Sequence, residues 1–238
     1  MTALASETAM VMAAGLGKRM RPLTASQPKP MVRVAGKPLI DHALDRLAEA
    51  GVTKAVVNVH YLADALEAHL KARKAPTVAI SDERELLLET GGGMAKALPH
   101  LPDPFFCLNA DNIWLDGPRD AFADLSARWN PDEMDALLLV VPHARASNFR
   151  GQGDFHMDPH GRLKRRLPGR VAPFIYTGIQ IVSHRLLRDA PEGPFGTMLL
   201  WERAIAEGRL FGANFTGQWF EVGTPEAIAP TEEALQSG

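Results

Sequence analysis

Glycines and cations are concentrated in one stretch near the N-terminus, Gly15-Leu16-Gly17-Lys18-Arg19-Met20-Arg21-Pro22. The stretch follows residues 10–14, which are small or apolar and predict a buried strand. Glycine lets backbone N–H groups approach a ligand closely, and a guanidinium group can bind two phosphate oxygens at once. We therefore predict that this loop binds a polyphosphate.

Two common phosphate-binding motifs do not fit this loop. A Walker A motif requires Ser or Thr after Gly-Lys, but Arg19 follows Lys18, and Met12 stands where its first glycine belongs. A dinucleotide-binding fingerprint requires a third glycine at the position of Met20 and a continuous helix, which Pro22 opposes. The loop must therefore bind phosphate in another way.

Residues 15–30 resemble the signature of the sugar-phosphate nucleotidyltransferases, or nucleoside-diphosphate-sugar pyrophosphorylases: G-x-G-x-R-M/L-x-P-L-T followed by P-K-P. Every fixed position of this signature is present, with Pro28-Lys29-Pro30 as its second part. The resemblance implies that Arg19 contacts the triphosphate and Lys29 the reactants' phosphates. It further implies that the nucleotide is bound by Ala13, Ala14, Gly15, Gly17, Lys18 and Arg19.

A carboxylate is expected to face the same crevice. Asp111 follows the apolar run 105–108, so it lies at the carboxyl end of a predicted strand, where ligands bind in α/β sheets. Asn109-Ala110-Asp111-Asn112 resembles the metal-binding element of the family, and a hard oxygen ligand suits Mg²⁺. The family's second metal ligand is an aspartate that is replaced here by Glu221, whose extra methylene moves the carboxylate by about 1.5 Å. The resemblance thus implies a Mg²⁺ cofactor held by Asp111 and Glu221, or mainly by Asp111 and the phosphates.

Three consecutive glycines follow Glu89 and Thr90, and we expect them to precede a short helix over 94–98. Their exposed backbone N–H and C=O groups would then read the edge of a nucleobase. The family binds the base here, which implies that Glu89, Thr90, Gly91 and Gly92 bind the nucleotide. The E-T-G-G-G form resembles the bacterial N-acetylmuramate 1-phosphate uridylyltransferases of peptidoglycan recycling within the family.

The sugar phosphate is expected to bind to the second half of the chain. The resemblance implies sugar-phosphate contacts by Lys29, Asn112, Gly153, Asp154, Thr177 and Gly178. Either Arg165 or Arg166 would supply a further cation.

The resemblance implies an enzyme that joins a nucleoside triphosphate to a sugar 1-phosphate and releases pyrophosphate, with Arg19, Lys29 and Asp111 as catalytic residues. UTP and N-acetylmuramic acid 1-phosphate are the favoured substrates. The alternatives are a guanylyltransferase for mannose or heptose 1-phosphate and a thymidylyl- or uridylyltransferase for glucose 1-phosphate. A regulatory protein that binds nucleotide sugars without catalysis is the alternative outside this class.

Strand and helix patterns alternate through the first half of the chain. Predicted strands at 55–59, 77–80 and 105–108 alternate with helices at 39–48, 62–72 and 94–98, as in a doubly wound parallel sheet. The second half has further strands at 136–141, 153–157, 162–166, 174–182, 210–215 and 219–222, and helices at 120–129, 196–206 and 225–235. We expect a single-domain, Rossmann-like (GT-A-like) α/β fold over 1–238, with a mostly parallel mixed sheet flanked by helices and a small antiparallel sugar-binding region. Residues 1–115 would bind the nucleotide and 116–238 the sugar, and the length leaves no room for the C-terminal β-helix of some family members.

The composition sets limits on partners and location. The formal net charge of −2 gives no support for binding to nucleic acid or to anionic membranes. The longest apolar run, 136–141, is far shorter than the roughly 20 residues of a membrane helix, and residues 1–8 lack the features of a signal peptide. The single cysteine, Cys107, lies in an apolar run and is expected to be buried and reduced. We expect a cytoplasmic monomer or small homo-oligomer.

Overall fold

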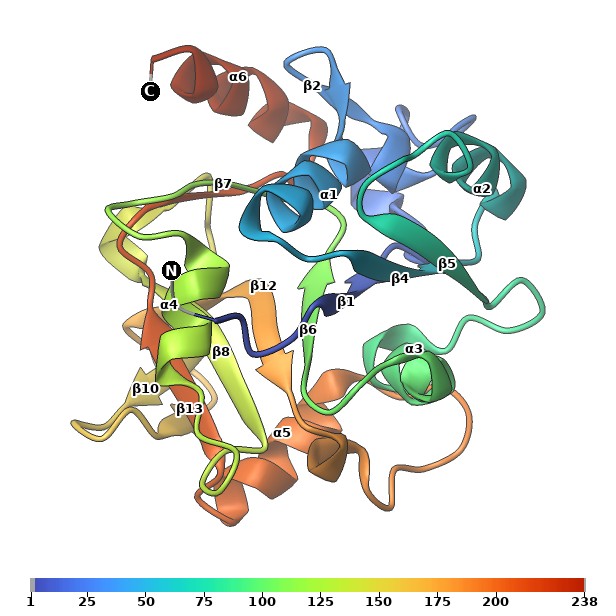
Figure 1. The fold of residues 1–238 in the computed structure, drawn as a ribbon. Coiled ribbons are helices and arrows are strands. Elements are labelled where there is room, and N and C mark those ends of the chain that lie inside the picture. The colour runs from blue at the N-terminus through green and yellow to red at the C-terminus, as the bar shows by residue number, and fades with distance from the viewer. Residues whose placement is uncertain (1–2, 238) are drawn as a thin grey trace.

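The computed structural model describes residues 3–237. A nine-stranded mixed sheet forms its centre, with helices packed on both faces (Figure 1). Its main path runs in the order β11 (Leu163–Arg165), β10 (Phe155–Met157), β12 (Phe174–Val182), β6 (Phe105–Asn109), β1 (Thr8–Met12), β4 (Lys54–Val59) and β5 (Thr77–Asp82). β8 (Ala136–Pro142) pairs with β12, and β13 (Leu210–Asn214) pairs with β8.

The strands β6, β1, β4 and β5 run parallel to one another. Parallel neighbours need a crossover connection, and α1 (Leu39–Ala50), α2 (Ala63–Leu70) and α3 (Glu89–Ala97) lie in those connections. All four strands therefore end at the same edge of the sheet, and Met12 of β1 pairs with Asn109 of β6. The first loop and the segment around Asp111 leave the sheet side by side.

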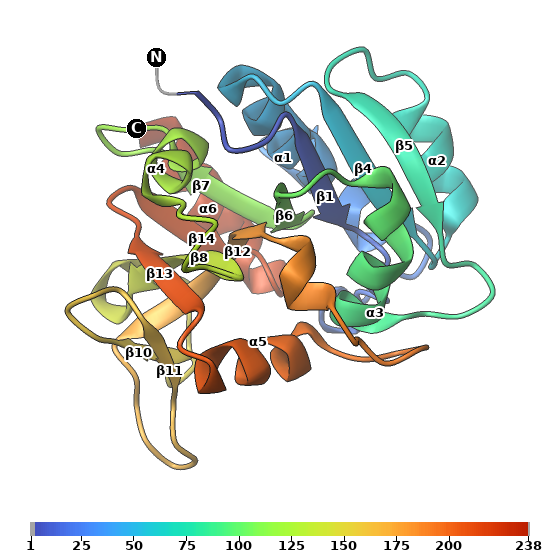
Figure 2. The ribbon, with the colours of Figure 1, turned by 60° about the horizontal axis from the view of Figure 1, so that its bottom comes forward.

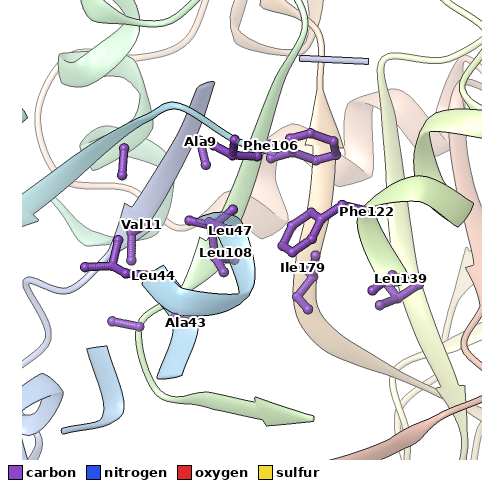
Figure 3. Close-up of a cluster of buried hydrophobic side chains, with 14 of the residues drawn as sticks. Ala9, Val11, Ala43, Leu44, Leu47, Phe106, Leu108, Phe122, Leu139 and Ile179 are labelled. Carbon is purple, nitrogen blue, oxygen red and sulfur yellow. The ribbon is translucent and has the colours of Figure 1, made fainter. Parts of the chain in front are cut away.

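Alternating side chains of the strands pack against different helices. Ala9 and Val11 of β1 belong to the core under α1 and α2, whereas Met10 belongs to the core under α3 and α5 (Thr197–Ala206). Figure 3 shows the first core, where α1 and α4 (Ala121–Arg128) cover the sheet and Phe106 meets Phe122 edge to face at 5.1 Å. Figure 2 shows α3 and α5 on the opposite face, where they contact each other.

The second half of the chain joins this sheet through β12, which is antiparallel to both β6 and β8. A separate three-stranded sheet consists of β7 (Asn112–Leu115), β14 (Gln218–Glu221) and β9 (Ala146–Ser147). In its antiparallel pair, Glu221 lies opposite Asn112. A two-stranded hairpin of β2 (Arg33–Val34) and β3 (Lys37–Pro38) and the C-terminal helix α6 (Ile228–Ser237) complete the fold.

The predicted fold class, an α/β domain with a mixed sheet flanked by helices, is confirmed. Gly51 ends α1 in a left-handed conformation, and Cys107 is buried as predicted, at 2% exposed. The first strand runs over Thr8–Met12 instead of 10–14, so Ala13 and Ala14 lie in the loop. The strands β7 and β9 were not predicted, because two to four residues give too short a pattern to identify.

None of the helices within residues 3–237 is both long enough and apolar enough to cross a membrane.

Candidate active site

Two hollows adjoin at the carboxyl edge of the parallel strands. The first hollow has a volume of about 370 Å³ and is lined by Ala13, Ala14, Gly15, Lys29, Asn58, Glu89, Thr90, Asn109 and Asp111, among others. The second hollow has a volume of about 230 Å³ and is lined by Arg19, Asn109, Asp111, Asn112, Asp154, Tyr176, Thr177, Gly178, Trp219 and Glu221, among others. Because Asn109 and Asp111 line both hollows, one ligand in each would meet at these two side chains.

A series of buried hydrogen bonds through Asn58 and Glu83 holds the start of the first loop in place. The Ala13 N–H donates to Asn58 Oδ1 at 2.7 Å, and Asn58 Nδ2 donates to Glu83 Oε1 at 2.7 Å. Glu83 Oε2 accepts from the Leu88 N–H at 3.1 Å. Asn58 and Glu83 are each 1% exposed, so their orientations are fixed by these bonds. The lining contributed by Ala13–Gly15 therefore depends on a side chain of β4 and one that follows β5.

Lys29 and Asp111 form an ion pair at the boundary of the two hollows. Lys29 begins a short 3-10 helix after Pro28. Its Nζ donates to Asp111 Oδ2, and the two side chains are 13% and 32% exposed. A cation and a carboxylate thus face the place where ligands of the two hollows would meet.

Arg19 and Glu221 form a second ion pair, at 3.5 Å between Nη1 and Oε1. The Arg19 side chain is 69% exposed and can therefore turn toward a ligand. The prediction that Arg19 and Asp111 face one crevice is confirmed, because both line the second hollow. Glu221 reaches the same hollow because β14 pairs it with Asn112, the residue after Asp111.

The floor of the second hollow is formed where Gly178 meets the asparagines of β6 and β7. Gly178 has a φ of +85°, and a Cβ atom there would lie 2.5 Å from Asn112 Nδ2 and 2.7 Å from Asn109 Nδ2. Asn112 Nδ2 is buried and makes no hydrogen bond with the described part of the chain. Since a buried donor without a partner is costly, Asn112 is poised to donate to a ligand in this hollow.

Asp154 adds a carboxyl group to the second hollow. Its Oδ2 accepts from the Tyr176 N–H at 2.9 Å. Burial raises the pKa of Asp154, and the hydrogen bond from Tyr176 and the charge of Arg166 oppose this shift. The Thr177 hydroxyl donates to the Leu139 carbonyl at 2.9 Å, so it could only accept a hydrogen bond from a ligand in this hollow.

The expectation for the three glycines is wrong in its structural part. Residues 91–93 lie inside α3, which begins at Glu89. The Gly91 and Gly92 N–H groups donate to the Phe195 carbonyl at 2.9 and 3.1 Å, so these two glycines have no free N–H for a base. A Cβ atom at Gly91 would lie 2.3 Å from the Phe195 ring, and one at Gly92 would lie 2.5 Å from the Gly193 carbonyl. The glycines therefore permit close packing, and neither Gly91 nor Gly92 lines the first hollow, unlike Glu89 and Thr90.

Three other predicted site residues, Gly17, Lys18 and Gly153, line neither of the two hollows. Gly17 has a φ of +59°, and its carbonyl accepts from the Thr24 hydroxyl at 2.8 Å, which closes the first loop. Lys18 is exposed. A Cβ atom at Gly153, whose φ is +76°, would lie 2.1 Å from the Ala172 carbonyl.

Neither candidate for the additional sugar-phosphate cation lines the second hollow. Arg165 pairs with Glu202 of α5. Arg166 donates through Nε to the Gly153 carbonyl at 2.9 Å and through Nη1 to Gln152. Without substrate, both guanidinium groups bind neighbouring groups of the chain, and a phosphate contact by either stays a prediction.

Sequence reasoning missed Asn58 and Asn109. Both are polar residues in otherwise apolar strands, 54–59 and 105–109, and that interruption was the available signal. A polar side chain inside a buried strand needs a partner, so it marks a possible site.

Known proteins resemble this chain in sequence and in fold. Residues 8–164 match the family model described as nucleotidyl transferase. The chain is 45% identical over 236 residues to the N-acetylmuramate alpha-1-phosphate uridylyltransferase of Caulobacter vibrioides. The alignment covers 97% of this chain and 98% of that protein. The chain is 34% identical over 223 residues to the protein of the same name from Neisseria meningitidis serogroup B, covering 91% and 93% of the two chains.

Among solved structures, the inositol-1-phosphate CTP transferase from T. maritima matches with a TM-score of 0.78 over 98% of this chain and 96% of that chain. At 18% identity, this likeness shows the fold alone. The family predicted from the signature at residues 15–30 is confirmed by the family model and by the close relatives. The chain therefore belongs to the nucleotidyl transferase family.

Proposed function

We propose that this protein transfers the uridylyl group of UTP to N-acetylmuramic acid 1-phosphate, with release of pyrophosphate, in the cytoplasm during peptidoglycan recycling. The observation that carries the proposal is that Asp111 lines both hollows, with Lys29 beside it in the first and with Arg19 and Glu221 in the lining of the second. The relatives named N-acetylmuramate alpha-1-phosphate uridylyltransferase support the choice of substrates.

The reaction is an in-line displacement at the α-phosphorus of UTP. A phosphate oxygen of the sugar 1-phosphate forms a bond to that phosphorus, and the bond from the α-phosphorus to the pyrophosphate oxygen breaks. Both reactants are anions, so catalysis depends on their positioning and on neutralising their charge. In the proposal, UTP lies in the first hollow, its base near Glu89 and Thr90, and the sugar phosphate lies in the second hollow.

Arg19 and Lys29 are the cations proposed to bind the phosphates. Each is paired with a carboxylate in the structure, Arg19 with Glu221 and Lys29 with Asp111. Each pair keeps a cation beside a carboxylate without substrate, and the phosphates would compete for the cations when they bind. Asn112, with its unpartnered buried Nδ2, is proposed to donate to the sugar phosphate.

The carboxylates fit Mg²⁺. Mg²⁺ in phosphoryl-transfer sites is commonly held by one or two protein carboxylates, with substrate phosphates and water as the other ligands. Within residues 3–237 no group of three or more His, Cys, Asp or Glu side chains is placed to hold a metal, whereas Asp111 and Glu221 line one hollow. Bound there, the ion would neutralise charge on the phosphates.

A pyrophosphate-release assay tests the proposal. UTP, GTP, CTP and dTTP are each combined with the 1-phosphates of N-acetylmuramic acid, mannose, heptose and glucose. We expect turnover with UTP and the muramic acid derivative that requires Mg²⁺. Preferred turnover of GTP with mannose or heptose 1-phosphate, or of dTTP with glucose 1-phosphate, would replace the proposed substrates by those alternatives.

The variant Asp111→Asn tests the role of the carboxylate. We expect kcat/KM to fall by about 10²- to 10³-fold, comparable with the loss of one electrostatic contact in a transition state. The matched control is Asp64→Asn, because the Asp64 side chain is 95% exposed on α2. Full activity of Asp111→Asn would refute its assignment, and nucleotide-sugar binding by a wild-type protein without turnover would favour a regulatory protein.

A further inference from the structure

A third hollow adjoins the second one on the side of the loop between β9 and β10. It has a volume of about 540 Å³ and shares Arg19, Phe149, Glu221 and Gly223 with the second hollow. Arg150 lines only the third hollow. A substituent of a sugar bound in the second hollow can therefore extend past Phe149 toward Arg150.

We propose that Arg150 binds a carboxylate substituent of the sugar substrate and thereby selects a sugar 1-phosphate that carries one. This inference rests on the proposed function, and it identifies the group that distinguishes the muramic acid derivative from a neutral sugar. Muramic acid differs from glucosamine by a lactyl ether whose carboxylate is negatively charged at neutral pH. An arginine is suited to this group because its guanidinium can donate two parallel hydrogen bonds to a carboxylate.

The second hollow offers no cation for a carboxylate in addition to the phosphate. The cation in its lining is Arg19, which is proposed to bind phosphate, and its carboxyl groups are those of Asp111, Asp154 and Glu221. The third hollow also contains the carboxyl groups of Glu221 and Glu226, but it adds a second arginine, Arg150. A carboxylate substituent is attracted to the hollow that supplies this further positive charge.

Arg150 is the uncommitted cation of the third hollow. Its guanidinium makes no hydrogen bond to, and no ion pair within 4.0 Å of, any of the residues 3–237, whereas Arg19 is paired with Glu221. The remaining carboxylate of the hollow, Glu226, accepts a hydrogen bond from Thr224, which is the main cause of its lowered pKa, and the charge of Arg150 contributes last. Arg150 can therefore turn to a ligand without breaking an ion pair.

The two residues that precede Arg150 are held by other elements of the fold. Asn148 donates through Nδ2 to the Thr231 hydroxyl of α6 at 3.2 Å, and Thr231 is fully buried. The Phe149 ring packs against Trp219 at 6.4 Å between centroids. Because its two preceding neighbours are held by α6 and β14, the backbone of Arg150 has a defined position beside the second hollow.

The test compares two sugars that differ only in the lactyl group. N-acetylmuramic acid 1-phosphate and N-acetylglucosamine 1-phosphate are assayed with UTP for wild type, Arg150→Ala and Arg150→Lys, and their dissociation constants are measured by calorimetry. We expect Arg150→Ala to lower kcat/KM for the lactyl sugar by about ten- to a hundredfold, the range for a hydrogen bond to a charged group, with no change for the other sugar. Arg150→Lys should recover part of the loss, since it restores the charge but not the paired donors.

The control is Arg145→Ala, whose side chain lies in the same region but donates to the Thr216 carbonyl and lines none of the three hollows. We expect it to match wild type with both sugars. Equal losses for both sugars in Arg150→Ala, or no loss for either, would overturn the inference. If wild type turns over neither sugar, the proposed function fails, and tighter, Arg150-dependent binding of the lactyl sugar still decides the inference by calorimetry.

Discussion

Replacing Asn58 by leucine should destabilise the protein because it removes the link between the first loop and Glu83. Leucine keeps the branched shape of the side chain but neither hydrogen bond. The Ala13 N–H, in a residue only 5% exposed, loses its acceptor at 2.7 Å, and the Glu83 carboxylate loses the donor at 2.7 Å while keeping that of Leu88.

The magnitude follows from these two losses. An unsatisfied buried amide costs about 1–3 kcal/mol, and a lost hydrogen bond to a charged group costs about 1.5–3 kcal/mol. Burial of the apolar leucine side chain returns about 1 kcal/mol. We expect the free energy of unfolding to fall by about 1.5–5 kcal/mol, which is a large part of the roughly 5–15 kcal/mol typical of a domain.

The assay is urea unfolding of wild type, Asn58→Leu, Glu83→Gln and the double variant, followed by tryptophan fluorescence. With Asn58 present, Glu83→Gln replaces a hydrogen bond to a charged carboxylate by a weaker one to an amide. In the Asn58→Leu background, Glu83→Gln instead removes a buried negative charge that has lost one of its hydrogen-bond donors. We therefore expect Glu83→Gln to destabilise the wild type but to stabilise Asn58→Leu, with a coupling energy above about 1 kcal/mol. A loss below about 1 kcal/mol in Asn58→Leu, or an equal effect of Glu83→Gln in both backgrounds, would refute the reasoning.

Two further predictions concern packing and ionisation. Gly92→Ala should lower the free energy of unfolding by about 1–3 kcal/mol, because its Cβ atom would lie 2.5 Å from the Gly193 carbonyl. The control in the same urea experiment is Gly15→Ala, whose Cβ atom would have no other atom within 4 Å. Equal stability of the two variants would contradict the prediction. Burial raises the pKa of Cys107 from 9.0 to about 12, so the native thiol should resist alkylation by iodoacetamide at pH 9.0 and react only after unfolding. Since the unfolded chain releases this proton near pH 9.0 and the folded chain only near about 12, the free energy of unfolding should fall as the pH rises through that interval. Rapid alkylation of the native protein would show that Cys107 is accessible.

The candidate site was predictable from sequence where the signal is local. The residues of the first loop match the family signature position by position, which marks this loop as part of the candidate site. Asp111 closely follows the apolar run 105–108, which marks it as a residue at the end of a strand. Parallel strands place their carboxyl ends at one edge, so the meeting of the first loop with Asp111 followed from the fold class.

The glycines of α3 show where local reasoning fails. Glycine has a low helix propensity, and three in succession favour a loop. In the structure, the Phe195 carbonyl accepts from the Gly91 and Gly92 N–H groups, which lack partners within the first turn of a helix. This contact links residues about a hundred positions apart, and the close packing it requires explains the glycines.

The sequence by itself determined the fold class, the position of the first loop after β1 and the identity of the cations in that loop, because these depend on neighbouring residues and on strand order. Only the tertiary structure decided which charges neutralise each other: Lys29 and Asp111 are 82 positions apart, and Arg19 and Glu221 are 202 positions apart. It also decided that Arg150, beside the second hollow, has no ion-pair partner among residues 3–237. Pairing of this kind depends on distances of a few ångströms between side chains from separate elements, and periodicity and spacing along the chain do not contain those distances.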